Sequence, residues 1–296
     1  MKERFGRLIR QLAARVVAPL IESQDENRRK TDRQIQLLLS LDYQHALQSS
    51  TLPKFEETGF RTFGEIDEDG KLWFIFSLIG AAHKTLVDIG AAGIDGSNSA
   101  NLIINHGWTG LLIDANERAV NAIASYYSKC PETRNFPPKA LRAWVTAENI
   151  NPIIAENGYR GEIDLLLVDI DGVDYWIWKA IDCIRPRVVL LEYQAIWGPE
   201  KSLTVPYAPA FKAEYYGRFG IYSGASLAAF VKLGREKGYR LVGCNAYGYN
   251  AFFLRNDVGQ GIIPEVQPEA CFEHPFARWA HEELLPKVID RDWVEV

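Results

Sequence analysis

The chain has 296 residues, of which 47% are hydrophobic and 24% are charged, a balance typical of a globular protein with a sizeable core. Its net charge of −5 argues against nucleic acid as a partner. The four cysteines are scattered without a CxxC pair and no apolar run approaches the length of a membrane span, so we expect free thiols and a cytoplasmic protein.

Residues 1–60 are expected to form an N-terminal helical extension. Apolar residues recur at helical spacing in two sets that a charged stretch separates, and Pro19 is expected to bend or end the first helix. Residues 1–48 hold nine Lys or Arg residues against six Asp or Glu residues. Two interpretations stay open. The helices pack on the main domain or on another copy of the chain, or a basic amphipathic segment rests on an anionic membrane surface.

Residues 61–257 are expected to form an α/β domain, because short apolar strands alternate with helical patterns. Such alternation predicts a mostly parallel sheet with helices on both faces. The expected strands are residues 85–89, 110–114, 140–145, 164–170 and 188–193, and the expected helices are residues 97–106, 117–129, 148–157 and 174–184.

The pattern changes after residue 193. An irregular stretch rich in Pro, Tyr and Gly extends to about residue 223, and we expect it to cover a cleft. A helix at 225–237 and two close strands at 239–244 and 250–255 then predict a closing antiparallel hairpin. Residues 258–296 are expected to form a C-terminal tail with a helix.

The stretch TLVDIGAAGIDGS places an acid directly before a glycine-rich turn. Gly90, Gly93 and Gly96 follow the first strand, where ligands bind in parallel α/β folds and where glycine lets ligand atoms approach the backbone. Asp114 ends the next strand, at a spacing where an acid commonly binds ribose hydroxyls. The carboxylate of Asp88 would oppose a pyrophosphate but attract an ammonium and a sulfonium group. The pattern favours S-adenosylmethionine over a nicotinamide or flavin, and a turn without a ligand is the remaining alternative.

Three further carboxylates are predicted to meet at the same edge of the sheet. Asp169 and Asp171 follow one strand, and Glu192 ends the next. They suit either a general base for an acceptor hydroxyl or a set of oxygen ligands for Mg²⁺. Structural alternatives stay open, in which Asp171 holds a turn or Glu192 pairs with an arginine. Within the covering segment, Tyr222 is the ring that we expect to contact the acceptor.

Eight segments carry a resemblance to a known family. They are EDGKLWFIF, VDIGAAGIDGS, GWTGLLIDAN, VTAENIN, DLLLVDIDGVDYWIWKAI, LEYQAIWGPEKSLTVPY, YSGASLAAFVKLGREKGY and NAFFLR. From about residue 63 to residue 255, the chain resembles the class I S-adenosylmethionine-dependent methyltransferases, and within them the FkbM-like methyltransferases. The resemblance implies a Rossmann-like sheet of seven strands, mostly parallel, with a closing antiparallel hairpin.

The resemblance also implies roles for particular residues. Asp88, Gly90 and Gly93 would line the methionine end of the cofactor, Asp114 would bind its ribose, and residues 146–148 would lie near its adenine. The expected cofactor-binding residues are Asp88, Gly90, Ala91, Gly93, Gly96, Ser97, Asp114, Ala115, Thr146, Ala147, Glu148 and Asp169.

We therefore expect an S-adenosylmethionine-dependent O-methyltransferase that acts on a sugar or glycan hydroxyl. Its expected catalytic residues are Asp169, Asp171, Glu192 and Tyr222, and the first three are the candidate ligands of Mg²⁺. The alternatives are a methyltransferase for a small secondary metabolite or a nitrogen acceptor, and an inactive protein that binds S-adenosylmethionine. The expected location is cytoplasmic, either free or peripheral at the membrane surface through residues 1–48.

Overall fold

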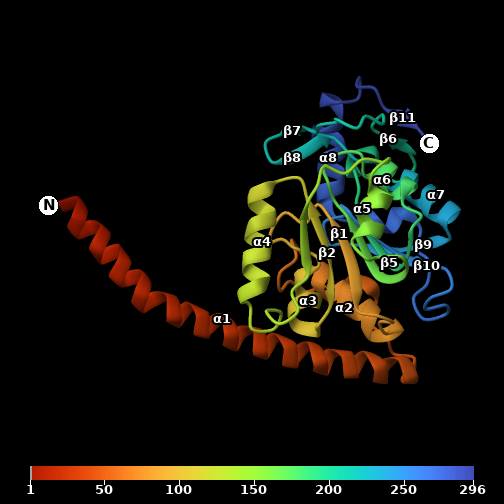
Figure 1. Cartoon of the computed structure of the whole chain (residues 1–296). Helices are drawn as coiled ribbons and strands as arrows, with labels where there is room; N and C mark the ends of the chain where they lie inside the picture. Colours follow the sequence, from red (N-terminus) through yellow and green to blue (C-terminus); the bar gives the residue numbers. More distant parts are fainter. Residues whose placement is uncertain (1) are drawn as a thin grey trace.

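A sheet of seven strands forms the centre of this computed structural model, which describes the backbone of residues 2–296 and the side chains of residues 24 and 26–296. The strand order is β3-β2-β1-β4-β5-β10-β9, and helices cover both faces (Figure 1). Neighbouring strands are parallel except at β10, which is antiparallel to β5 and to β9. This confirms the expected Rossmann-like sheet with its closing hairpin.

The bounds of most elements lie close to those expected. The sheet contains β1 (Thr85–Ile89), β2 (Thr109–Asp114), β3 (Lys139–Arg142), β4 (Gly161–Val168), β5 (Ile184–Glu192), β9 (Tyr239–Cys244) and β10 (Asn250–Arg255). The helices are α1 (Lys2–Ser49), α2 (Glu68–Ile79), α3 (Ala100–His106), α4 (Glu117–Lys129), α5 (Ile150–Glu156), α6 (Asp174–Ala180), α7 (Leu227–Lys237) and α8 (Pro275–Glu283). Strand β3 ends earlier than expected because its only neighbour, β2, ends at Asp114, opposite Arg142.

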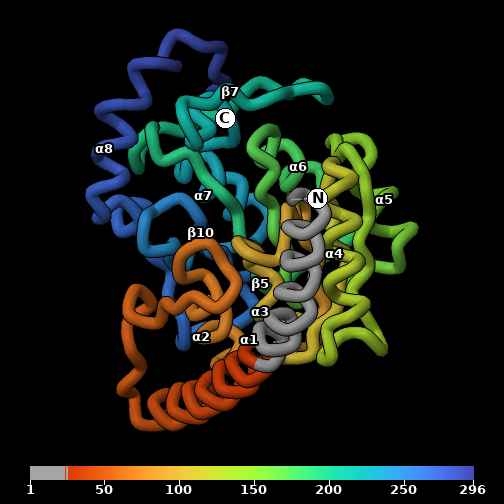
Figure 2. Tube along the Cα trace, turned by 90° about the vertical axis from the view of Figure 1, so that its left-hand side faces the viewer, coloured from red at the N-terminus to blue at the C-terminus, as the bar shows by residue number. Residues whose placement is uncertain are grey.

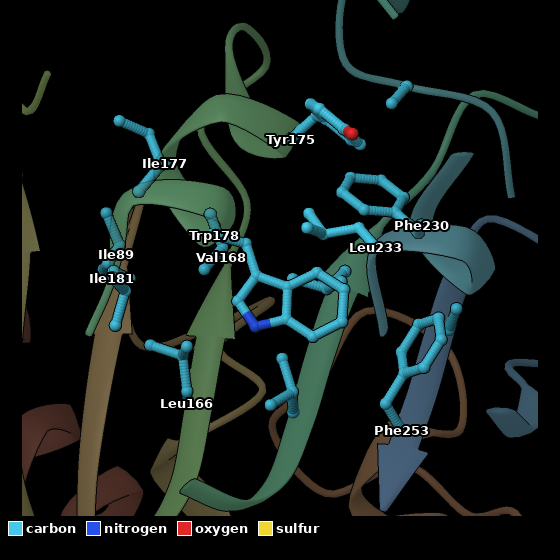
Figure 3. Close-up of a cluster of buried hydrophobic side chains, with 14 of the residues drawn as sticks. Ile89, Leu166, Val168, Tyr175, Ile177, Trp178, Ile181, Phe230, Leu233 and Phe253 are labelled. Atoms are coloured by element: carbon cyan, nitrogen blue, oxygen red, sulfur yellow. The ribbon is translucent and has the colours of Figure 1, made fainter. Parts of the chain in front are cut away.

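Both faces of the sheet are buried, which explains why its strands are continuous apolar runs. On one face, Trp178 of α6 is 1% exposed and packs between Phe230 of α7 and Phe253 of β10 (Figure 3). On the other face, α2 and α3 contribute fully buried side chains such as Ile75 and Ile103. This double burial fixes the positions of the strand ends, where the candidate site lies.

Helix α1 continues without interruption through Pro19, so the first helix does not end there as the sequence had suggested. Its residues from Gln36 onward pack on α2 and α3 (Figures 1 and 2). The Gln36 carbonyl accepts a hydrogen bond from the Trp73 indole at 2.6 Å, and the Tyr43 ring meets the Phe74 ring edge-on at 5.0 Å. The first apolar set of the extension, residues 5–21, lies outside the described side chains.

The covering segment and the tail meet at the carboxyl ends of the parallel strands (top of Figure 1). The covering segment contains β6 (Leu203–Thr204), β7 (Glu214–Tyr216) and β8 (Phe219–Tyr222), and the tail strand β11 (Val294–Glu295) pairs with β6. Ala280 of helix α8 belongs to a small hydrophobic cluster that also contains Ile196 and Ile221 of the covering segment. The tail therefore holds the covering segment over the sheet. All four cysteines are free, and no helix in the described residues is both long enough and apolar enough to cross a bilayer.

Candidate functional site

Two adjoining cavities open at the carboxyl ends of the central strands. The first lobe, of about 210 Å³, lies beside the ends of β1 and β2, and the second lobe, of about 110 Å³, lies over the ends of β4 and β5. Gly90, Ala92 and Asp169 line both lobes and mark the place where they meet. Ligands of parallel α/β folds bind in this position, so the two lobes form the candidate site.

Two of the three turn glycines are required by the backbone. Gly90 has a φ of +100°, and a Cβ atom there would lie 1.6 Å from the carbonyl oxygen of Asp169. Gly96 has a φ of +87°, and its N–H donates to the carbonyl of Phe63 at 2.7 Å. Gly93 has no such constraint and borders the open second lobe. Any side chain at Gly90 would thus displace the backbone of Asp169, directly after the end of β4.

Asp88 lies in the wall of the second lobe with only 6% of its surface exposed. The hydroxyl of Ser99 donates to its Oδ2 at 2.6 Å. Burial raises the pKa of Asp88 to about 6, the Ser99 hydrogen bond opposes this rise, and the charge of Asp114 adds to it. A cation in the second lobe would therefore favour loss of the proton from Asp88.

Asp169 and Glu192 form a hydrogen-bonded carboxyl pair between the ends of β4 and β5. Burial raises the pKa of both groups well above the ordinary range, and the charges of the neighbouring carboxylates raise them further. Two buried carboxyls that are hydrogen-bonded to each other share one proton and titrate together. The ionised member of the pair is a candidate base whose pKa lies above that of an ordinary carboxylate.

Two acids of the turn after β4, Asp174 and Asp171, make different contacts. Asp174 accepts hydrogen bonds from the N–H groups of Ile170 and Gly172, at 2.8 and 2.9 Å, and so holds the turn. Asp171 has a φ of +50° and accepts a hydrogen bond from the hydroxyl of Tyr215 at 3.0 Å. Asp171 therefore lines the first lobe without being the residue that stabilises the turn.

The two lobes have no lining cation among the described residues, since neither contains a Lys, Arg or His side chain. Within the same part of the chain, Asn98 Oδ1 is buried against the second lobe without a hydrogen-bond partner. An acidic lobe with a free amide oxygen is suited to a positively charged ligand that carries N–H donors.

The expected Mg²⁺ ligands do not form a metal centre. Asp169 and Glu192 are hydrogen-bonded to each other, and Asp171 accepts a hydrogen bond from the hydroxyl of Tyr215. No group of three or more His, Cys, Asp or Glu side chains is placed to hold a metal ion anywhere in the described chain. The carboxyls at this edge therefore fit a proton-sharing base better than a metal site.

The remaining cofactor residues divide into those that line a lobe and those that do not. Asp114 and Ala115 line the first lobe, and Ala91 and Ser97 line the second. The Oγ of Ser97 also accepts from the N–H of Ala100 at 3.2 Å, at the start of α3. These four residues thus border the lobes, and their role in cofactor binding stays a prediction.

Thr146, Ala147 and Glu148 lie beyond the first lobe rather than in its wall. The hydroxyl of Tyr207 donates to Glu148 at 2.6 Å and accepts from the Ala147 N–H at 2.9 Å, which ties this segment to the covering segment. The wall is formed instead by the preceding residues of the same stretch, Ala143, Trp144 and Val145. They reach the lobe because β3 ends at Arg142.

Tyr222 lines neither lobe. Its hydroxyl donates to the carbonyl of Asp292 at 2.9 Å, and its ring lies 5.1 Å from Trp293, so it joins the covering segment to the tail. The covering segment reaches the first lobe through Pro209 and Phe211 instead.

Four polar residues that line the second lobe are not among the site residues expected from the sequence: Glu65, Asp95, Asn98 and Asn250. The β-bridge between Gly64 and Gly96 places Glu65 beside the second lobe. The pairing of Asn250 with Glu192, between β10 and β5, places Asn250 there. Knowledge that β10 lies next to β5 would have indicated Asn250, but no local motif indicates Glu65.

No family model matches the chain, and no curated protein matches it. Among solved structures, it is similar to the O-methyltransferase from Bacillus cereus in complex with SAH, with 13% identity over 73% of this chain and 88% of that chain and a TM-score of 0.39. It is similar to the magnesium protoporphyrin IX methyltransferase from Synechocystis PCC 6803 with bound SAM, with 12% identity over 60% and 69% of the two chains and a TM-score of 0.32. It is also similar to a SAM-dependent methyltransferase from Methanosarcina mazei, with 13% identity over 57% and 90% of the two chains and a TM-score of 0.35.

Proposed function

We propose that this protein transfers a methyl group from S-adenosylmethionine to a hydroxyl oxygen. The observation that carries the proposal is the acidic second lobe, where Glu65, Asp88, Asp169 and Glu192 meet without a lining cation among the described residues. A ligand with an ammonium and a sulfonium group relieves the repulsion between these carboxylates, whereas a pyrophosphate would add to it. A nicotinamide or flavin coenzyme is disfavoured for this reason.

The two lobes fit the two ends of S-adenosylmethionine. Asp114 borders the first lobe, and the N–H of Asn116 holds its Oδ1 at 2.6 Å, so this fixed carboxylate is the one that would accept hydrogen bonds from the ribose hydroxyls. The rings of Trp144 and Phe211 provide apolar walls for a flat base. In the second lobe, Asp88 and the free amide oxygen of Asn98 accept hydrogen bonds from the ammonium group.

The acid pair supplies the base for the reaction. When bound, S-adenosylmethionine provides a methyl group that its positive sulfur activates for in-line displacement. Asp169 lies where the lobes meet, and the ionised member of its pair with Glu192 takes the proton from the acceptor hydroxyl. Such a base contributes on the order of 10²–10⁴ in rate. No step passes through a metal, because the donor set does not form a metal site.

The acceptor that we propose is a sugar or glycan hydroxyl. Carboxylates and tyrosine hydroxyls bond well to sugar hydroxyls, and Tyr215 and Tyr249 both present their hydroxyl groups to carboxylates of the site. An amine acceptor is the second candidate, because the same acidic lobe attracts a protonated amine and the same base removes its proton.

Transfer of a labelled methyl group tests the proposal. Wild-type protein is incubated with methyl-labelled S-adenosylmethionine and a panel of sugars, glycans and amines, with and without EDTA. We expect label in a sugar hydroxyl, equal activity with EDTA, and a loss of about 10²–10⁴ in kcat for Glu192→Gln. A panel without turnover would support the alternative of an inactive binding protein. Label on nitrogen would support the second candidate, and loss of activity with EDTA would refute the metal-free base.

A further inference from the structure

Five aromatic side chains form a continuous surface beside the second lobe, which we call the tail aromatic surface. Three segments contribute to it: the β7–β8 hairpin, the turn before β10, and helix α8 of the tail. Its residues are Phe219, Tyr247, Tyr249, Phe276 and Trp279. The Phe276 ring lies at its centre, 5.8 Å from Phe219, 5.7 Å from Trp279 and 6.1 Å from Tyr249.

Two of the five rings are exposed to solvent, and the surface is held in place by its neighbours. Trp279 is 38% exposed and Tyr247 is 39% exposed, which is uncommon for large rings that touch one another. His274 accepts a hydrogen bond from the Phe276 N–H at 3.1 Å, and its ring lies 4.5 Å from the Tyr247 ring in a tilted arrangement, so it fixes the start of α8. His281 bonds to the carbonyl of Ile196 at 2.8 Å and anchors the other end. Because these rings are already held in place, the surface loses little conformational entropy when a ligand binds to it.

The surface is continuous with the acidic site. The hydroxyl of Tyr249 donates to Glu65 at 3.3 Å, and Glu65 lines the second lobe. From the hairpin, the hydroxyl of Tyr215 donates to Asp171 in the first lobe. A ligand whose reactive group enters between the lobes can therefore extend over Tyr249 and Phe276 onto Trp279.

We propose that the tail aromatic surface binds the additional sugar rings of an uncharged oligosaccharide acceptor, of which the ring nearest Asp169 is methylated. This inference rests on the proposed function of the site. One face of a sugar ring presents C–H groups, which pack against the electron-rich face of an aromatic ring. A monosaccharide or a small flat metabolite would fill the lobe without reaching α8.

The charge of the site restricts the acceptor further. Glu65, Asp169, Asp171 and Glu192 lie at the end of the surface where the reactive hydroxyl must enter. A phosphate or sulfate there would meet these carboxylates at close range in a partly buried space. Nucleotide sugars, sugar phosphates and nucleic acids are therefore excluded as acceptors, and neutral glycans are accepted.

Binding to an array of immobilised glycans tests the inference. The array carries neutral, phosphorylated and sulfated glycans of one to six sugar units, and the fluorescently labelled protein is applied with S-adenosylhomocysteine. The variants are Trp279→Ala and Tyr247→Ala, and the matched control is Phe136→Ala, an exposed ring between α4 and β3. We expect neutral glycans of three or more units to bind best, and each variant to weaken this binding about tenfold while the control leaves it unchanged.

Several results would overturn the inference. They are a preference for phosphorylated or sulfated glycans, equal binding of single sugars and longer chains, no glycan binding at all, or variants that behave like Phe136→Ala. Calorimetry with S-adenosylmethionine on every variant shows that the fold and the lobes are intact. If wild-type protein does not bind S-adenosylmethionine, the proposed function fails, whereas normal cofactor binding with unaltered glycan binding in the variants refutes the aromatic surface alone.

Discussion

At the scale of single residues, we expect Asp88 to decide which ligand the second lobe accepts. Asp88→Asn keeps the size of the side chain and its hydrogen bond from Ser99 but removes the charge. We expect the affinity for S-adenosylmethionine to fall about 10- to 100-fold, as for loss of a charged hydrogen bond. Isothermal calorimetry measures the change, and Glu265→Gln, a partly exposed partner of Arg235, is the control. Unchanged affinity in Asp88→Asn would remove this residue from the binding site.

The raised pKa of Asp88 makes cofactor binding depend on pH. Below its pKa of about 6 the side chain is protonated and no longer attracts a cation. We expect the affinity for S-adenosylmethionine to be constant above pH 7 and to fall by up to about tenfold per pH unit below 6. In the Asp88→Asn variant, the affinity for S-adenosylmethionine should change less with pH. A wild-type affinity that is constant from pH 5 to 8 would contradict the assignment.

The sequence predicted the residues that are close together in the chain. Asp88, Gly90 and Gly96 belong to one turn, and Asp169 and Glu192 end two strands whose order follows from the alternating pattern. Side chains that reach the site through distant pairing, such as Glu65, carry no local signal. Tyr222 was misplaced because its chain position says nothing of the contact with Asp292 that orients it.

At the scale of elements, the contact between α1 and α3 depends on a neutral histidine. His106 bonds to Oε1 of Gln36 at 2.6 Å and stacks 3.6 Å from Trp73. Since that oxygen only accepts, Nε2 carries the proton. Burial lowers the pKa of His106 to about 3, and the charges of Arg33 and Lys84 lower it further.

This lowered pKa predicts a loss of stability in acid. The unfolded chain takes up the proton near pH 6.5, whereas the folded chain does so near pH 3, so the unfolded state binds more protons between these values. We expect this group to remove about 2 kcal/mol of unfolding free energy between pH 7 and pH 5. Urea unfolding at both values measures the loss, which His106→Gln should reduce. An equal loss in wild type and variant would place the acid sensitivity elsewhere.

The outer side of α1 exposes a row of large apolar side chains. Leu38 and Leu41 are 66% and 63% exposed, opposite the side that packs on α2. We propose that a second copy of the chain covers this row. Residues 34–53 contain no Lys or Arg, so this part of the helix has no basic residues to hold an anionic membrane.

Light scattering on purified protein tests this pairing. We expect the mass of a dimer for wild type and the mass of a monomer for the double variant Leu38→Gln and Leu41→Gln, because burial of exposed leucines drives the association. Phe136→Gln, an exposed ring elsewhere, should remain dimeric. A monomeric wild type, or binding to anionic vesicles that the double variant loses, would contradict the proposal.

At the scale of the whole molecule, the sheet was predictable from the sequence, but the position of the tail on the sheet was not. Strands buried on both faces leave continuous apolar runs, which made the parallel strands and the closing hairpin of the sheet recognisable in the sequence. A helix was expected in the tail and α8 lies there, but the position of the tail depends on contacts between distant residues, such as those of β11 with β6. Consequently the tail aromatic surface, to which α8 contributes Phe276 and Trp279, is a property of the assembled fold.

The central claim is that the acidic lobe selects a positively charged methyl donor over a phosphorylated coenzyme. Calorimetric titration of the wild-type protein with S-adenosylmethionine and, separately, with NADH tests it most directly. The account predicts saturable binding of S-adenosylmethionine with release of protons near pH 6, and no binding of NADH. Saturable binding of NADH, together with no detectable binding of S-adenosylmethionine, would contradict it.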